Sequence, residues 1–295
     1  MQTCTEIREI LAGAGLSPNK RLGQCFMIDK NLLGKVLALS ETSSDRTVLE
    51  VGPGTGTMTE ELLDRAGRVV AVELDGGLAG VVRRRFARRD NFVLIEGDVL
   101  AGKHALSPAV KSALGPSADL VANLPYSIAT PLVAQCLIES WKALFGPREG
   151  TVCFDRMTFT VQQEVARRML ANPGGGEYGP ISVLAALMGI GTIGPAIPAR
   201  AFWPVPKIAS RALRIDFDRS AAGEVKDVTV LAGVVSMAFG QRRKQIGSIM
   251  KRARGSFAPA ALRAALDTAR IDPSSRAERI APEQFRLLAN ALQVE

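Results

Sequence analysis

The sequence contains one histidine and no closely spaced pair of cysteines. His104 is the single imidazole among 295 residues, so a histidine-based metal cluster is excluded and a His-dependent triad would rest on that one side chain. The four cysteines are scattered and form no C-x-x-C pair, which is the usual spacing of cysteine metal ligands. We therefore expect no metal centre.

A secretory leader and a clean membrane span are also missing. Scattered cysteines without a leader are typical of a reducing compartment, so we expect a cytoplasmic protein. The stretch 178–199 carries no charge and is long enough to span a membrane. Glycines and prolines interrupt it, so a buried helix followed by a strand is favoured over a membrane segment.

Charge is distributed unevenly along the chain. The net charge is +8, and residues 1–199 hold 20 basic and 20 acidic side chains, so residues 200–295 carry the whole excess. A basic surplus confined to one part predicts a surface that faces a polyanion such as RNA. A solvated basic surface without a partner is the alternative.

Strand and helix patterns alternate between residue 47 and about residue 217, which predicts an α/β fold. The strands are expected at 47–51, 68–72, 91–95, 117–122, 151–161 and 208–217, the last at the edge of the sheet. From about residue 219 the pattern is purely helical. We divide the chain into a catalytic domain, 1–218, which includes an N-terminal arm at 1–30, and a basic helical domain, 219–295.

A glycine-rich turn follows the first predicted strand of this region. It contains Gly52, Gly54 and Gly56 behind Glu50, whereas a dinucleotide fingerprint would require glycine where Thr57 stands. Glycines allow the backbone to approach a ligand closely and to adopt positive φ. The spacing suits a cofactor with a ribose and an amino-acid tail but no pyrophosphate, which favours S-adenosyl-L-methionine over NAD.

Acidic residues end the next two predicted strands. Glu73 closes the second strand, where a carboxylate can accept hydrogen bonds from both ribose hydroxyls. Asp98 follows the third strand, where it can accept from an adenine amine. Turn or helix caps are the alternative for both acids. S-adenosyl-L-methionine fits all three features, and NAD fits two.

The segment Asn123-Leu124-Pro125-Tyr126 follows a short apolar strand pattern and precedes a helix whose first turn holds Pro131. It should therefore lie at the carboxyl edge of the sheet, where ligands bind in open α/β folds. An amide, a proline carbonyl and an aromatic ring can together receive a flat base that carries an exocyclic amine. A proline turn with a half-buried tyrosine is the alternative.

Taken together, these motifs resemble the ribosomal RNA adenine N6-dimethyltransferase family of the KsgA type. The segments that carry the resemblance cover nearly the whole chain and are 20–27, 49–56, 72–75, 97–99, 123–126, 163–166, 202–208 and 239–244. The resemblance implies a Rossmann-like methyltransferase sheet with a small C-terminal all-α domain. It also implies S-adenosyl-L-methionine as the cofactor.

The resemblance further implies which residues form the site. The expected cofactor contacts are Cys25, Met27, Gly52, Gly54, Glu73, Asp98 and Asn123. The family commonly has asparagine at position 25 and leucine at position 27. Cysteine lacks the amide, so a side-chain hydrogen bond at position 25 is in question, whereas a backbone contact would survive, and the sequence leaves both open. In the expected reaction, Asn123 and the Pro125 carbonyl accept the N6 hydrogens of adenine, while Tyr126 and Phe202 stack on its two faces.

The implied function is N6,N6-dimethylation of two adjacent adenosines in the 3′-terminal hairpin loop of 16S ribosomal RNA. The implied partner is an immature small ribosomal subunit, bound by a chain that we expect to be a monomer. The candidate RNA-binding residues are Arg242, Arg243, Lys244, Lys251 and Arg252, and the arginine run at 83–89 is a weaker candidate. The alternatives are a methyltransferase for large-subunit RNA, a non-catalytic assembly or nucleic-acid-binding factor on the same fold, and a dehydrogenase.

Overall fold

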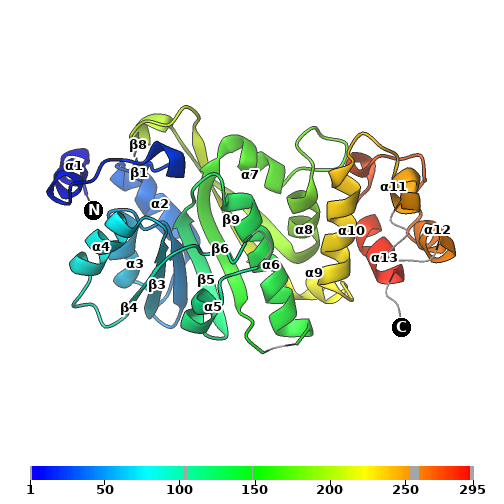
Figure 1. Ribbon diagram of the computed structural model, residues 1–295, viewed down its shortest axis with the longest axis horizontal. Helices are drawn as coiled ribbons and strands as arrows, with labels where there is room; N and C mark the ends of the chain where they lie inside the picture. Colours follow the sequence, from blue (N-terminus) through cyan, green and yellow to red (C-terminus); the bar gives the residue numbers. More distant parts are fainter. Residues whose placement is uncertain (1, 103–104, 148, 253–258, 293–295) are drawn as a thin grey trace.

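The computed structural model describes residues 2–102, 105–147, 149–252 and 259–292. A seven-stranded sheet in the order β4-β3-β2-β5-β6-β9-β7 forms its centre (Figure 1). The first five strands in this order are parallel, and β9 and β7 are antiparallel to their neighbours. The strands are β2 (Thr47–Val51), β3 (Arg68–Glu73), β4 (Phe92–Glu96), β5 (Ser117–Asn123), β6 (Cys153–Gln162), β7 (Gly189–Ile197) and β9 (Ser210–Phe217).

The central strands are apolar on both faces because helices cover both sides of the sheet. In β2, Val48 belongs to a core formed with α2, α3 and α4, whereas the next residue, Leu49, belongs to a core formed with α5, α6 and α8. These helices are α2 (Lys30–Ser40), α3 (Thr57–Leu63), α4 (Gly76–Arg85), α5 (Pro108–Leu114), α6 (Ala129–Phe145) and α8 (Pro180–Met188). The predicted α/β architecture is confirmed.

Two sequence predictions about the far side of the sheet had different outcomes. The uncharged stretch forms α8 followed by β7, as expected, and no helix among the described residues is long and apolar enough to cross a membrane. The prediction that 208–217 is an edge strand is wrong, because β7 pairs with the outer side of β9. Alternating burial shows that one face of a strand is covered, but it does not show how many strands flank it.

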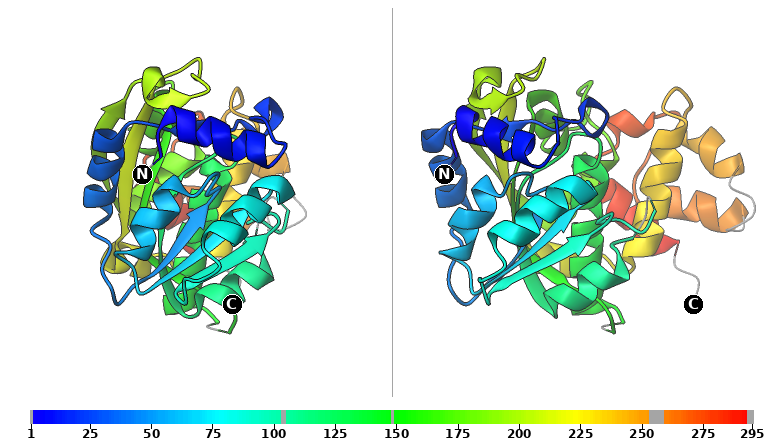
Figure 2. Two further views of the ribbon diagram at one scale, coloured as in Figure 1. Left: turned by 90° about the vertical axis from the view of Figure 1, so that its left-hand side faces the viewer. Right: turned by 60° about the vertical axis from the view of Figure 1, so that its left-hand side comes forward.

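The N-terminal arm lies across the carboxyl ends of the first strands. It contains α1 (Cys4–Gly13), a 3-10 turn (Lys20–Leu22) and β1 (Phe26–Met27), which pairs with β8 (Phe202–Trp203) in a separate two-stranded sheet. Figure 2 shows α1 lying above α3 and α4 in both views. At the end of the arm, the side chain of Asp29 accepts from the Leu32 amide and caps α2, as the sequence predicts.

The C-terminal helices pack on the sheet region through a shared core. They are α9 (Arg219–Gly223), α10 (Val228–Gly240), α11 (Ile246–Arg252), α12 (Pro259–Thr268) and α13 (Pro282–Ala291), and α7 (Gln163–Met169) precedes α8 on the sheet side. The Tyr178 hydroxyl donates to the Ile280 carbonyl at 2.9 Å, and the Tyr178 ring lies 5.8 Å from that of Phe239. One cluster of buried side chains therefore continues from the sheet into α10 and α13.

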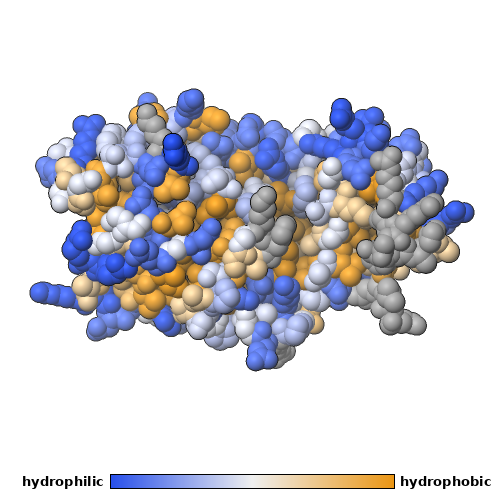
Figure 3. Space-filling view, in the orientation of Figure 1, coloured by the Kyte–Doolittle hydropathy of each residue, from blue (hydrophilic) through white to orange (hydrophobic). Residues whose placement is uncertain are grey.

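The hydropathy of the surface changes along the long axis of the molecule. Figure 3 shows apolar side chains across the middle of one face and hydrophilic side chains at both ends, including the end formed by the C-terminal helices. The sheet ends at Phe217 and α9 begins at Arg219, next to the predicted domain boundary. Residues 219–295 hold 13 basic and 7 acidic side chains, so +6 of the net charge of +8 belongs to the helical part of the chain.

Candidate functional site

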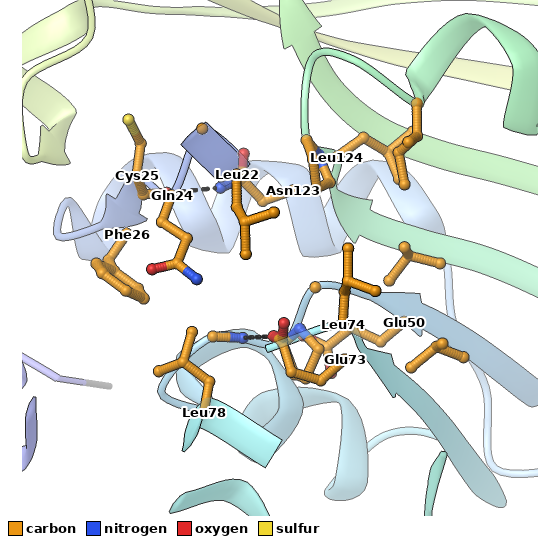
Figure 4. Close-up of a pocket in the computed structure, with 18 of the residues that line it drawn as sticks. Leu22, Gln24, Cys25, Phe26, Glu50, Glu73, Leu74, Leu78, Asn123 and Leu124 are labelled. Carbon is orange, nitrogen blue, oxygen red and sulfur yellow. Dashed lines mark hydrogen bonds between the residues drawn. The ribbon is translucent and has the colours of Figure 1, made fainter. Parts of the chain in front are cut away.

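A cavity opens at the carboxyl ends of β2, β3 and β5, where open α/β sheets bind their ligands (Figure 4). Most of its lining comes from five segments: the arm at 21–27, the glycine turn at 50–55, the end of β3, the loop 97–99 and the segment 123–128. The helices α2, α3 and α4 contribute the remaining side chains. The sequence-predicted cofactor residues on these segments are therefore brought together in space, although they are separated by up to a hundred positions in the chain.

The glycine turn requires glycine for both conformation and space. Gly52, Gly54 and Gly56 have φ of +70°, +61° and +85°, values that other residues rarely adopt. A Cβ atom at Gly54 would lie 2.9 Å from the Phe26 ring, and one at Gly56 would lie 2.6 Å from the Phe86 ring. The turn is consequently packed against the arm on one side and against the end of α4 on the other.

Glu73 is held in the cavity by main-chain donors. The Gly54 amide donates to its Oε2 at 3.2 Å, and the Asp75 amide donates to its Oε1 at 3.0 Å. The side chain is 6% exposed, and burial raises its pKa although these amides oppose the rise. Each carboxylate oxygen has further acceptor capacity, which is the arrangement needed to bind two neighbouring hydroxyls.

Asp98 lines the same cavity but remains exposed to solvent. Its Oδ1 accepts from the Leu100 amide at 2.9 Å, so one oxygen stabilises the turn after β4. The other oxygen remains available to a ligand. Both interpretations of this residue, as a turn cap and as a ligand contact, are compatible with its geometry.

The amide of Asn123 is fixed in orientation by two neighbours. Its Nδ2 donates to the Cys25 carbonyl at 3.1 Å, and its Oδ1 accepts from the hydroxyl of Thr160, the residue opposite it in β6. Reversing the amide would place its oxygen against the Cys25 carbonyl, so the oxygen must face Thr160. That oxygen retains a second lone pair, and the Pro125 carbonyl, which accepts from the Ile128 amide at 3.1 Å, also retains one.

Tyr126 is half-buried at the rim of the cavity. Its hydroxyl lies 3.1 Å from the Ser210 hydroxyl at the start of β9, which fixes the ring direction. Burial raises the pKa of Tyr126, and the Ser210 hydroxyl partly opposes this rise. The ring is therefore neutral at physiological pH.

Cys25 and Met27 meet the cavity in different ways. The Cys25 main-chain carbonyl binds Asn123, and Figure 4 shows the sulfur pointing away from Glu73. Burial raises the pKa of the Cys25 thiol, which keeps it protonated. Met27 lines the cavity with a side chain that is 5% exposed and packs against α2. A main-chain role for position 25 fits this geometry.

Phe202 does not reach the cavity in this structure. It pairs with Met27 across the small sheet, is 1% exposed, and packs in the core beneath the arm. β8 turns its ring inward, so the position needed for stacking opposite Tyr126 is not occupied by Phe202. Its stacking role stays a prediction that requires the ring to move out of this core.

Three residues in or directly behind the site were given no role by the sequence analysis. Glu50, at the end of β2, and Gln24, whose Nε2 donates to Asp75 at 3.0 Å, both line the cavity. Gln2 lies behind the glycine turn and accepts from the Thr55 and Thr57 hydroxyls at 2.5 and 2.6 Å. An acid two positions before the first glycine of the turn is a usable sequence signal for a site residue at Glu50. Nothing in the local sequence marks Gln2 as a residue that supports the turn.

The candidate RNA residues have different surroundings. Arg243, Lys244 and Lys251 are exposed, whereas Arg242 donates to the Gly176 carbonyl at 2.8 Å and pairs with Glu278 at 3.3 Å. The side chain of Arg252, and residues 253–258 with Arg254, lie outside the described residues, as does His104. In the 83–89 run, three arginines pair with acids on neighbouring elements: Arg83 with Glu96, Arg85 with Glu60 and Arg89 with Asp64.

The fold and the cavity define the class of the protein. A dimethyladenosine transferase from Plasmodium falciparum superposes with a TM-score of 0.68 at 21% identity, over 89% of this chain and 95% of that one. The 23S rRNA methyltransferase ErmE superposes with a TM-score of 0.57 at 25% identity, over 90% and 99%. The chain is a Rossmann-like methyltransferase, and this fold implies use of S-adenosyl-L-methionine.

Sequence comparison then identifies the family. The ribosomal RNA adenine dimethylase family matches residues 15–294, and the chain belongs to that family. Two relatives share the name ribosomal RNA small subunit methyltransferase A. The protein from Magnetococcus marinus is 36% identical over 96% of this chain and 95% of its own length. The one from Shouchella clausii is 34% identical over 96% and 92%.

Proposed function

We propose that this chain transfers methyl groups from S-adenosyl-L-methionine to N6 of two adjacent adenosines in the 3′-terminal hairpin loop of 16S ribosomal RNA. The observation that carries the proposal is that Glu73 and the segment Asn123–Tyr126 open into one cavity. A carboxylate able to bind a ribose and two carbonyl oxygens able to bind an amine therefore face the same space. The names of the relatives support the small-subunit RNA as the substrate.

The residues of the cavity act mainly by positioning. The N6 amine of adenine is a weak nucleophile because its lone pair is delocalised into the ring. Accepting its two hydrogens at Asn123 Oδ1 and at the Pro125 carbonyl would localise that lone pair, and the sulfonium cofactor supplies an electrophilic methyl carbon. Correct placement of two reactants can lower a barrier by about 7–11 kcal/mol in favourable cases.

Tyr126 would hold the extruded base in register with these acceptors. The target base must leave its stack to be reached. A ring fixed by the Ser210 hydroxyl offers a preformed face, and stacking on such a face contributes roughly 1–3 kcal/mol. The same ring leaves the amine edge of the base free for Asn123 and Pro125.

The helical end would contact the RNA backbone. Arg243, Lys244 and Lys251 are exposed and form no ion pair with any described residue, so their charges remain available to phosphates. The partner would be an immature small ribosomal subunit, bound in the cytoplasm by a monomer. Arg242 would instead hold the loop at 172–179 against the helices that carry these cations.

The deciding experiment supplies labelled methyl donor to unmethylated small subunits and, in a parallel reaction, to unmethylated large subunits, and maps the modified bases. We expect two adjacent dimethylated adenosines in the hairpin loop near the 3′ end, and label incorporated about 10²–10³-fold more slowly by the Asn123→Ala variant. Label in large-subunit RNA would overturn the proposed substrate. Absence of transfer by protein that binds the donor would identify a non-catalytic assembly factor.

A further inference from the structure

Glu50 is a buried carboxyl group to which the mechanism above gives no task. It lies near the end of β2, is 2% exposed, and lines the cavity beside Glu73 (Figure 4). Its Oε2 is fully buried and finds no hydrogen-bond partner among the described residues. Burying a carboxylate without a partner costs free energy. Glu50 is therefore expected to be a neutral acid unless a positive charge lies beside it.

The groups that face Glu50 do not supply a counter-charge. Glu73 of β3 and Thr59 of α3 are close enough to affect its charge. The other titratable or charged groups that line the cavity are Asp98, Tyr126, Cys25 and Arg21. No ion pair of Glu50 or Glu73 is formed within the described residues, although Arg21 lines the mouth of the cavity. The two buried ionisable groups of the cavity lining, Glu50 and Glu73, are therefore both acidic.

Glu50 is consequently neutral when the cavity holds no ligand. Burial raises the pKa of Glu50 to about 8, and repulsion from Glu73 adds to the rise while the Thr59 hydroxyl opposes it. At pH 7 most molecules therefore carry a protonated Glu50. A positive charge brought into the cavity would reverse this balance, because a nearby opposite charge favours the ionised form.

We propose that Glu50 is the counter-ion for the positive charge of S-adenosyl-L-methionine, and that binding of this cofactor expels the Glu50 proton to solvent. The inference rests on the proposed function, which supplies the ligand. The cofactor carries a sulfonium, an ammonium and one carboxylate, so it brings one net positive charge. Glu50 is a binding residue in this scheme, and its role differs from that of Glu73, which accepts hydrogen bonds from the ribose hydroxyls.

Calorimetry in two buffers that differ in heat of ionisation counts the protons released on binding. At pH 7 we expect wild-type protein to release close to one more proton per site than the Glu50→Gln variant. The variant is the matched control, because its amide imitates the neutral acid and because the α-amino group of the free cofactor, with a pKa near 8, starts from the same protonation state in both titrations. Equal proton release by the two proteins would overturn the proposal.

The pH dependence of affinity provides a second readout. As the pH rises towards 8, the wild-type dissociation constant should decrease about tenfold per pH unit relative to that of Glu50→Gln. Above pH 8 the ratio of the two dissociation constants should become constant. A constant ratio of the two dissociation constants between pH 6 and pH 8 would contradict proton-linked binding.

Infrared difference spectroscopy on the wild-type protein needs no variant. Adding the cofactor should remove the carbonyl stretch of a protonated carboxylic acid, and persistence of that band after binding would overturn the proposal even if Glu50→Gln did not fold. The two hypotheses fail differently. Wild-type protein that does not bind the cofactor refutes the proposed function, whereas binding without loss of the band refutes only the role of Glu50.

Discussion

Asn123 reaches the cavity with both ends of its amide already engaged. Cys25 accepts from its nitrogen and Thr160 donates to its oxygen, so the fold fixes which end can face a substrate amine. Preorganised acceptors need no rearrangement when the substrate arrives, which is where enzymes gain most of their electrostatic advantage.

Replacing Asn123 by alanine should therefore remove turnover and leave cofactor binding nearly intact. We expect a loss of about 10²–10³-fold in kcat, comparable to removing one preorganised hydrogen-bonding group from other active sites. Transfer of a radiolabelled methyl group measures kcat, and calorimetry with the cofactor is the control. Wild-type turnover in this variant would contradict the role of Asn123.

Replacing Glu73 by alanine should act on the cofactor instead. The change removes the acceptor for two hydroxyls and leaves the Gly54 and Asp75 amides unpaired, so we expect the dissociation constant to increase about tenfold to a hundredfold. Calorimetric titration measures it. Glu73→Gln is the milder companion, and if both variants bound as tightly as the wild type, the ribose contact would be ruled out.

Glu50→Gln should raise the stability of the ligand-free protein in a pH-dependent way. The pKa of Glu50 is raised from 4.5 to about 8 in the folded protein. Between pH 4.5 and pH 8 the unfolded chain ionises this group and the folded chain does not, so Glu50 lowers the free energy of unfolding increasingly as the pH rises. Below pH 4.5 this destabilisation is absent. The gain at pH 8 should reach a few kcal/mol. Denaturant unfolding at pH 4.5 and pH 8 measures it, and a gain of equal size at both pH values would contradict the raised pKa.

The elements around the cavity were predictable to different degrees. Strand–turn–helix units left clear marks because each buried strand is apolar and the turn after β2 needs positive φ, and Asp29 marked the start of α2. The two-residue pairing of β1 with β8 leaves no periodic signal, and that pairing is what turns Phe202 into the core. Contacts between distant segments decide such features, and local patterns do not encode them.

The N-terminal arm supports the glycine turn through Gln2. This side chain is 6% exposed, accepts from the Thr55 and Thr57 hydroxyls, and donates to the Thr55 carbonyl at 3.2 Å. Ile7 and Leu11 of α1 anchor the arm in a small core that also contains Phe26 and Leu78. The arm is thus part of the cofactor cavity wall, although Gln2 itself does not line the cavity.

Gln2→Ala should weaken cofactor binding by several fold to about tenfold, because it leaves two buried hydroxyls without their acceptor and loosens the turn. Hydrogen exchange of the amides at 52–57 should become faster in the same variant. The matched control is Glu9→Ala, which alters an exposed side chain of α1. If the two variants bound the cofactor equally well, the arm would have no such supporting role.

At the scale of the whole molecule, most of the basic surplus belongs to residues 219–295, whereas the cavity lies at the carboxyl ends of β2, β3 and β5. The C-terminal helices lie at the opposite end of the molecule from these strands (Figure 1). The charge distribution predicted that the last part of the chain faces a polyanion, but it did not show which cations already form ion pairs. Arg242 joins the loop 172–179 to the C-terminal helices, and the arginines 83, 85 and 89 are paired with acids. Exposure and pairing, which only the structure provides, narrow the candidates for phosphate contacts.

The double variant Arg243→Ala and Lys244→Ala should bind RNA more weakly and with less dependence on salt. Losing two phosphate contacts should reduce the slope of log affinity against log salt by about 2. Filter binding of the hairpin RNA at several salt concentrations measures the slope. Arg83→Ala, which removes a cation already paired with Glu96, is the control and should leave the slope unchanged.

The core that runs without a break from the sheet into α10 and α13 has a further consequence. Cutting the chain at residue 218 would expose apolar side chains of α8 to water, so the two parts of the chain are not independent units. Under the proposed function, the exposed cations of the helical end and the methyl-transfer cavity would be held at a constant distance. The enzyme would then select its target adenosines by their distance from the phosphates that it binds.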